Sequence, residues 1–302
     1  DRHEGLFPPG FSAEHLGPND YYYWDNFWGL AGLRASVRLA QRLNLEKEKQ
    51  RMQSWADDFE DRIFSSIAKI SGKTKNCALP ASPYRRMDAG AVGSLAADYP
   101  LQITEPGDKR IMATIDYLMN NCFHSGAFFQ EMIHSGINIY LTLAIAQTFL
   151  RCGDPRYRIL IDRTAGLASP TGQWPEAIHP ITGGGCMGDG QHGWAAAEWI
   201  MMIRNLFVRE EGEQIIIGSG VFPRWLATGK PLIFGPTLAR GGKITVRLLQ
   251  PGGDGPVYVD IEAAGVKPDT EYRINVPGYV PETLRDAGKG IRLEPESAGA
   301  AV

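Results

Sequence analysis

Two acidic residues stand in surroundings suited to general acid–base chemistry. Asp25 follows three tyrosines and a tryptophan at 21–24, and burial among such rings raises the pKa of a carboxyl group. Glu176 follows Trp174 and Pro175 in a segment with room for a water molecule. Hydrolysis of a glycosidic bond needs such a pair, one carboxyl group protonated to assist the leaving oxygen and one ionised to activate water or attack the sugar.

These acidic residues also fit ordinary structural roles. Asp25 could cap the N-terminus of a helix, and Glu176 could be an acid of a surface loop. Asp88 fits a helix cap better than a ligand group, although Arg85 and Arg86 beside it favour a charged site. The residues alone leave these alternatives open.

The other residues suited to chemistry gather in four segments, each directly before an apolar helix. In a ring of helical hairpins the inner helices run in the same direction, so these segments meet at one end. Stacked aromatic rings with paired polar groups are a usual way to hold a sugar. The candidates for substrate contacts are Tyr23, Trp24, Arg85, Arg86, Asp88, His124, Trp174, Asp189 and His192.

Some of these candidates have a simpler interpretation. A structural hydrogen bond is an alternative role for His124 and for His192. Asp189 lies in the glycine-rich stretch 183–190 and could be a turn residue. That stretch is not a phosphate-binding loop, because no strand leads into it and no lysine follows.

The elements that must position these residues are helices up to about residue 210. Amphipathic periodicity predicts outer helices over 46–69, 109–121 and 154–167. Segments that are apolar on several faces predict buried helices over 24–43, 88–97, 134–150 and 191–208. The two kinds alternate along the chain, which indicates helical hairpins in an inner and an outer ring. A helical solenoid fits less well, because its repeats are more regular in length.

Beyond residue 213 the pattern changes to short strands separated by glycine and proline turns. The expected strands are 215–217, 232–234, 244–249, 257–263 and 272–276. We therefore expect two domains, a helical catalytic region over 1–212 and a small antiparallel β-domain, sandwich-like, over 213–302 with a flexible tail.

Composition narrows the classes of partner. The net charge of −3 and the absence of a basic stripe argue against nucleic acid. No apolar run reaches the roughly 18 residues that span a membrane. Four scattered cysteines form no metal-type pair and favour reduced thiols in the cytoplasm. We expect no cofactor and no metal ion. The N-terminal sequence lacks an initiator methionine, which suggests processing or a fragment.

One stretch resembles the final catalytic segment of glucoamylase-like glycosidases. It comprises Gln173–Glu176, then His179-Pro180 and Thr182-Gly183, then Gly193–Glu198. In that family the glutamate after proline is the general base, which implies this role for Glu176. His179 stands where the family often has Asp, and Ala195 where it often has Ser, so the substrate contacts could differ.

A second stretch, Tyr23-Trp24-Asp25, is similar to the Trp-acid site of the same superfamily. Glucoamylases carry Glu there, whereas trehalases and processing α-glucosidases carry Asp. The resemblance implies that Asp25 is the general acid, and it covers roughly residues 5–250. It also implies a six-hairpin (α/α) toroid of twelve helices, of which this chain supplies the later part, about seven. We expect an N-terminal portion of a longer precursor, or another chain, to complete the ring.

The sequence therefore predicts an inverting glycoside hydrolase, acting on an α-glucoside, with a saccharide as its partner. A glycoside phosphorylase on the same barrel is the first rival, and it would lack a catalytic base. A non-catalytic carbohydrate-binding protein is the second rival, and a structural helical scaffold is the third.

Overall fold

The computed structural model describes residue 3 and residues 5–12, 18–131, 135–188, 190–253 and 255–296. The chain forms two compact units. Unit 1 comprises Asp1–Cys152 and Ile159–Ala196, and unit 2 comprises Gly153–Arg158 and Ala197–Val302. The domain boundary after residue 212 stays a prediction.

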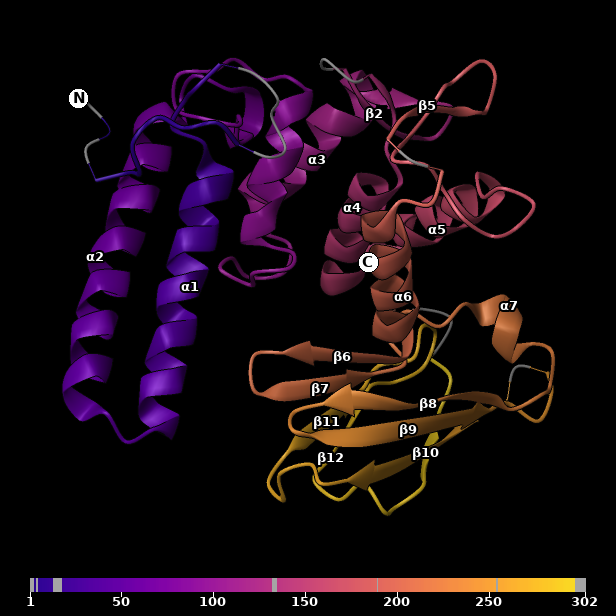
Figure 1. Ribbon diagram of the computed structural model, residues 1–302. Helices are drawn as coiled ribbons and strands as arrows, with labels where there is room; N and C mark the ends of the chain where they lie inside the picture. The colour runs from indigo at the N-terminus through magenta and orange to yellow at the C-terminus, as the bar shows by residue number, and fades with distance from the viewer. Residues whose placement is uncertain are drawn as a thin grey trace. The chain divides into compact units, whose positions relative to one another are not determined.

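Unit 1 is built from helices joined by long loops (Figure 1). They are α1 (Tyr23–Arg42), α2 (Glu46–Ile70), η1 (Lys75–Cys77), η2 (Ala89–Ala97), α3 (Lys109–Asn121) and α4 (Ile139–Cys152). Two further helices, α5 (Arg156–Gly166) and α6 (Gly193–Phe207), are divided between the two units. The periodicity of the sequence predicted α2, α3 and α5 within one or two residues, because each presents a single apolar face.

The helix η2 is buried along its whole length, as its small apolar residues predicted, but it is a 3-10 helix. The Asp88 side chain caps it by accepting a hydrogen bond from the Gly90 amide at 2.9 Å. Directly after η2, Asp98 forms a fully buried ion pair with Arg151 of α4, at 2.6 Å. The ends of these two helices are therefore tied together inside unit 1.

The apolar segment 134–150 is shorter as a helix than predicted. Helix α4 begins at Ile139, because the Asn138 side-chain oxygen accepts a hydrogen bond from the Leu141 amide at 3.0 Å and caps the first turn. Gly136 and Ile137 before it form a short strand, and residues 132–134 lie outside the described residues.

A five-stranded antiparallel sheet, which the sequence did not predict, joins the loops of unit 1. Its strands are β1 (Phe123–His124), β2 (Ala127–Gln130), β3 (Gly136–Ile137), β4 (Ala177–Ile178) and β5 (Gly185–Met187), in that order. Strand β3 requires glycine at position 136, since a Cβ atom there would approach the Ala177 Cβ to 2.7 Å and the Cys186 Sγ to 3.0 Å. Strands of two to four residues carry too little periodicity to be read from sequence.

The prediction that segment 24–43 is buried on nearly all sides is wrong for one face of α1. That helix packs on α2 and η2, yet Trp28 and Leu39 remain 42% and 58% exposed. The same holds for segment 191–208, where Trp194 and Ile200 of α6 are exposed. No described residue covers these faces.

Unit 2 contains the C-terminal strands as two four-stranded sheets (Figure 1). The first has the order β13-β10-β9-β8 and the second β12-β11-β7-β6. Their bounds are β6 Val208–Glu211, β7 Gln214–Ile217, β8 Leu232–Ala239, β9 Gly242–Leu249, β10 Val257–Ala264, β11 Glu271–Ile274, β12 Glu282–Leu284 and β13 Ile291–Leu293, with the short helix α7 at Pro223–Leu226.

The predicted strand with one buried face is present in β9, where Ile244, Val246 and Leu248 are buried and alternate with more exposed residues. The prediction of a purely antiparallel domain is wrong at one pairing, because β11 runs parallel to β7. The chain forms β8, β9 and β10 between these two strands, and such a long connection permits a parallel return.

Within the described part of the chain, no helix combines the length and the apolar character needed to cross a bilayer.

Candidate functional site

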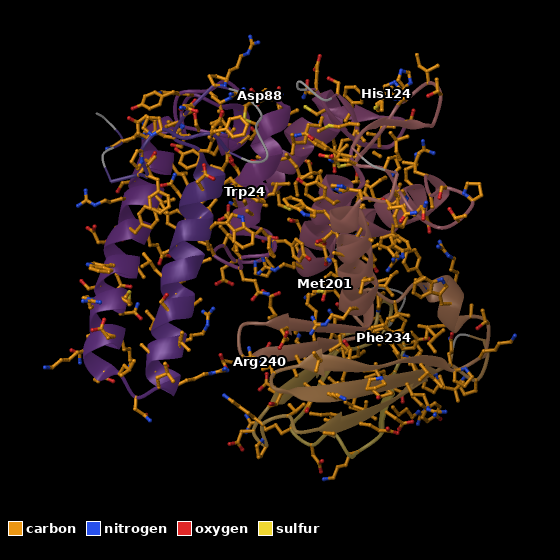
Figure 2. All side chains as sticks on the ribbon, viewed as in Figure 1. Trp24, Asp88, His124, Met201, Phe234 and Arg240 are labelled. Atoms are coloured by element: carbon orange, nitrogen blue, oxygen red, sulfur yellow. The ribbon has the colours of Figure 1, made fainter. Side chains whose placement is uncertain are left out.

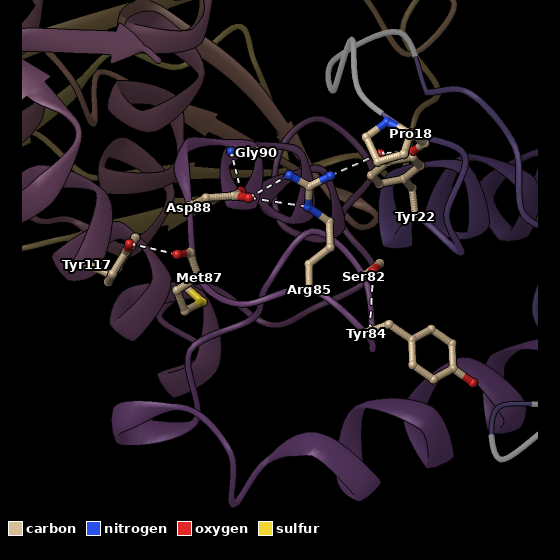
Figure 3. Close-up of polar contacts among 9 residues, drawn as sticks. All are labelled: Pro18, Tyr22, Ser82, Tyr84, Arg85, Met87, Asp88, Gly90 and Tyr117. Carbon is tan, nitrogen blue, oxygen red and sulfur yellow. Dashed lines mark hydrogen bonds and ion pairs between the residues drawn. The ribbon is translucent and has the colours of Figure 1, made fainter. Parts of the chain in front are cut away.

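A charged cluster lies immediately before η2 (Figure 3). The Arg85 guanidinium binds one Asp88 oxygen at 2.6 and 3.2 Å, while the other Asp88 oxygen caps η2. A further guanidinium nitrogen donates to the Tyr22 hydroxyl at 3.3 Å, and that hydroxyl donates to the Pro18 carbonyl at 2.7 Å. Burial raises the pKa of Tyr22, and Arg85 opposes the rise. Asp88 therefore serves as cap and ion-pair partner at once.

Asp25 lies in the first turn of α1 and does not cap it, because α1 begins at Tyr23. Its carboxyl group is half-buried, and this burial raises its pKa, while the neighbouring Ser12 hydroxyl opposes the rise. The direction is the one expected from the aromatic residues before it. A carboxyl group with a raised pKa can hold a proton for transfer to a leaving oxygen.

Tyr23 and Trp24, both predicted to contact substrate, differ in exposure. Tyr23 is fully buried, and its hydroxyl shares a hydrogen bond of 2.9 Å with Ser66 of α2. Its side chain therefore belongs to the packing of α1 on α2. Trp24 is half-buried on α1, with its ring 5.7 Å from that of Trp28 (Figure 2).

Glu176 stands directly before β4 and is packed against the backbone of the glycine-rich loop. Gly188 in that loop has a φ of +64°, and a Cβ atom there would clash with the Glu176 carboxylate and lie 2.7 Å from its Cβ. Only glycine therefore allows both the turn and the observed place of the Glu176 side chain. Asp189, the next residue, lies outside the described residues.

Trp174 and His192 frame the loop that carries Glu176. The Trp174 indole is buried and donates to the Thr164 carbonyl at 3.0 Å, and the Trp174 carbonyl accepts from the His192 amide at 2.8 Å. The His192 ring forms an aromatic group with Tyr140 and Trp194, with centroids 5.2 to 6.3 Å apart. The His192 Nε2 atom is buried and has no hydrogen-bond partner among the described residues.

Trp194 is 56% exposed beside this histidine, and the sequence interpretation missed it together with Tyr140. Segment 191–208 is apolar on several faces, so its sequence does not show whether an aromatic ring at the start of the helix is exposed or buried. The exposed Trp194 ring offers an apolar face to a ring-shaped ligand, whereas the His192 Nε2 atom beside it is closed to solvent.

The remaining candidates are exposed. Arg86 is exposed beside the Arg85–Asp88 pair, and His124 of β1 is exposed with its Nδ1 atom 2.9 Å from the Ser125 hydroxyl. Asp88 and His124 lie toward the same end of unit 1 in Figure 2.

Cys122 is buried directly before β1. Burial raises the pKa of Cys122 to about 11, and the nearby carboxylates of Asp88 and Glu131 raise it too. Strand β1, which contains His124, and strand β4, which follows Glu176, belong to one five-stranded sheet of unit 1. Among the described side chains, no group of three or more His, Cys, Asp and Glu residues is arranged to hold a metal ion.

Comparison with known proteins finds similarity of fold alone. No protein-family model matches the sequence, and no curated protein matches it. A wild-type glycosidase aligns with a TM-score of 0.52 and 14% identity over 66% of this chain and 55% of that chain. A variant glycosidase solved with glucose aligns with a TM-score of 0.50 and 14% identity, over 63% of this chain and 53% of that chain.

A sialidase aligns with a TM-score of 0.62 and 12% identity over 95% of this chain and 28% of that chain. The chain thus spans about half the length of the similar glycosidases and just over a quarter of the sialidase. It shares its fold with known glycosidases.

Proposed function

We propose that the protein is an inverting glycoside hydrolase that cleaves an α-glucoside, with Asp25 as general acid and Glu176 as general base. The observation that carries the proposal is the half-buried Asp25 carboxyl group, whose pKa burial raises. Such a group remains protonated at a pH where an ordinary carboxylate is ionised. The fold shared with glycosidases, one of them solved with glucose, supports the substrate class.

In the proposed reaction the Asp25 proton moves to the glycosidic oxygen as the bond from that oxygen to the anomeric carbon breaks. Glu176 removes a proton from a water molecule whose oxygen bonds to the same carbon from the opposite face. Asp25 ends ionised and Glu176 ends protonated, and exchange with solvent restores both. Gly188 supports this role of Glu176, because it keeps the carboxylate close to the loop.

The sugar is held by the groups around these carboxylates. The exposed Trp194 ring supplies an apolar face, and His192 lies beside that ring and belongs to the proposed substrate contacts. Trp24, Arg85, Arg86, Asp88, His124, Trp174 and Asp189 complete the proposed substrate contacts. The buried Tyr23 fixes the first turn of α1 on α2 through its bond to Ser66.

The helices belong to a six-hairpin (α/α) toroid that further helices complete, from a longer precursor or from another chain. The exposed face of α1 supports this, since Gly32 and Ala35 lie between the apolar Trp28 and Leu39. Small residues between large apolar ones allow another helix to approach closely.

The test is the configuration of the first product, followed by NMR on α-linked disaccharides with the helical ring complete. We expect inversion, loss of at least about 10³-fold in kcat for Glu176→Gln, and a smaller loss for Asp25→Asn on aryl glycosides, which need less protonation. Glu105→Gln, an exposed glutamate of unit 1, is the control and should keep full activity. Retention of configuration, phosphate-dependent product formation or sugar binding without turnover would each reject the proposal.

A further inference from the structure

A cleft lies within unit 1, and Arg85 and Arg86 of the proposed substrate contacts belong to its lining. It has a volume of about 730 Å³ and is formed by the loop after α2, the segment before η2 and the C-terminal half of α3. Neither Asp25 nor Glu176 lines it. This volume is in the range of clefts that hold small-molecule ligands.

One wall of the cleft is cationic. Lys73, Lys75 and Arg86 line it with exposed side chains, and none of these side chains makes a hydrogen bond or an ion pair within the described part of the chain. Arg85 also lines the cleft, but its charge is paired with Asp88. Three unpaired cations that converge on one cleft attract an anion and can donate several hydrogen bonds to it.

Another part of the lining, on α3, presents hydrogen-bond acceptors. The Asn120 and Asn121 amide nitrogens donate to backbone carbonyls one turn earlier, at 2.7 and 2.8 Å. Their side-chain oxygens are therefore left to accept hydrogen bonds from a ligand in the cleft. Acceptors of this kind suit a ligand that carries hydroxyl groups.

We propose that this cleft binds a polyhydroxylated anion, a sugar that carries a phosphate or a carboxylate group. The anionic group contacts Lys73, Lys75 and Arg86, and the hydroxyl groups donate to the side-chain oxygens of Asn120 and Asn121. An inorganic anion would leave the α3 wall without a partner, and a neutral sugar would leave the cations without one. The two walls together therefore select a ligand with both features.

The experiment is isothermal titration calorimetry on the full chain with four probes: glucose 6-phosphate, gluconate, glucose and inorganic phosphate. We expect saturable binding of glucose 6-phosphate or gluconate, weakened by added salt, and the better of the two identifies the anionic group. Glucose and inorganic phosphate should each bind at least about tenfold more weakly. Glucose lacks the charge-assisted hydrogen bonds to the cations, and inorganic phosphate lacks the hydrogen bonds from sugar hydroxyl groups to the asparagines.

The double variant Lys73→Glu/Lys75→Glu should weaken this binding at least about tenfold. Lys47→Glu/Lys267→Glu makes the same change in charge at exposed lysines that do not line the cleft, and it should bind as the unmodified chain does. Circular dichroism of both variants checks that they fold. Replacing Asn120 and Asn121 by Leu should weaken glucose 6-phosphate binding and leave inorganic phosphate binding unchanged.

Equal affinity for inorganic phosphate and glucose 6-phosphate would mean an adventitious anion only and would overturn the proposal. So would the same affinity in the two double lysine variants, or no binding of any probe. Binding should persist in Glu176→Gln, so a failure of the hydrolase mechanism and a failure of this site give different results.

Discussion

At the scale of single residues, the proposed general acid Asp25 also affects stability. Its pKa is raised by burial in the folded chain, so the folded state holds this proton more tightly than the unfolded state does. Its favourable contribution is complete below the ordinary carboxyl pKa and is lost as the pH rises through the raised value. We therefore expect Asp25→Asn to raise the midpoint of thermal unfolding at pH 7 relative to the unmodified chain, and to lose this advantage below about pH 3.5.

Thermal unfolding followed by circular dichroism between pH 3 and pH 8 measures this difference. Asp57→Asn, at an exposed position on α2, is the control and should show no such pH-dependent gain. An advantage for Asp25→Asn that grows as the pH falls would contradict the raised pKa.

Gly188 offers a second test at the residue scale. Gly188→Ala forces the new Cβ atom against the Glu176 carboxylate, so we expect kcat to fall at least about 100-fold, as displacement of a catalytic base does. Gly172→Ala is the matched control, because Gly172 also has a positive φ, of +80°, but faces open space. Both variants carry about 1 kcal/mol of backbone strain, so steady-state kinetics should separate them while their stabilities stay similar. Equal activity in the two variants would show that Gly188 does not position Glu176.

At the scale of elements, the buried Arg151–Asp98 pair fastens α4 to the end of η2. Arg151→Met leaves the Asp98 carboxylate buried without its partner, and we expect it to lower the free energy of unfolding by about 3–5 kcal/mol. Arg34→Met removes a partly exposed pair with Glu60 and should cost less than about 1 kcal/mol. Urea unfolding of both variants measures the difference, and similar losses would mean that the buried pair has no special role.

The same scale shows how far sequence patterns reach. The long helices α2 and α3 and the strand β9 were predicted closely, because each repeats one apolar face over several turns or residues. The sheet β1–β5 was missed, since its strands are short and their pairing partners lie far apart in the chain. The aromatic group of Tyr140, His192 and Trp194 was missed in part for the same reason, because its members come from two helices. The roles of Asp25 and Glu176 came from their neighbours in sequence and stay predictions.

At the scale of the whole molecule, the apolar face of α1 leads us to expect association. Trp28 and Leu39 are exposed on it, so the chain alone should self-associate at micromolar concentration. Trp28→Ser/Leu39→Ser should shift sedimentation velocity profiles toward the monomer, whereas Ile181→Ser, which removes an 87% exposed side chain from a loop, should not. If the unsubstituted chain stays monomeric, the main support is lost for the proposal that further helices complete the toroid.

The pairing of β3 with β4 has a consequence for the order of folding. It joins Ile137 to Ile178 across the whole of α4 and α5, and closing so long a loop costs entropy that local helix contacts do not pay. The segment that carries Glu176 should therefore order after the helices have formed and open before they do. Amide hydrogen exchange read by mass spectrometry should find residues 173–187 exchanging faster than α4, and slower exchange there would contradict this order. If Glu176 is the base we propose, the site would lose it first on warming, well before the helices unfold.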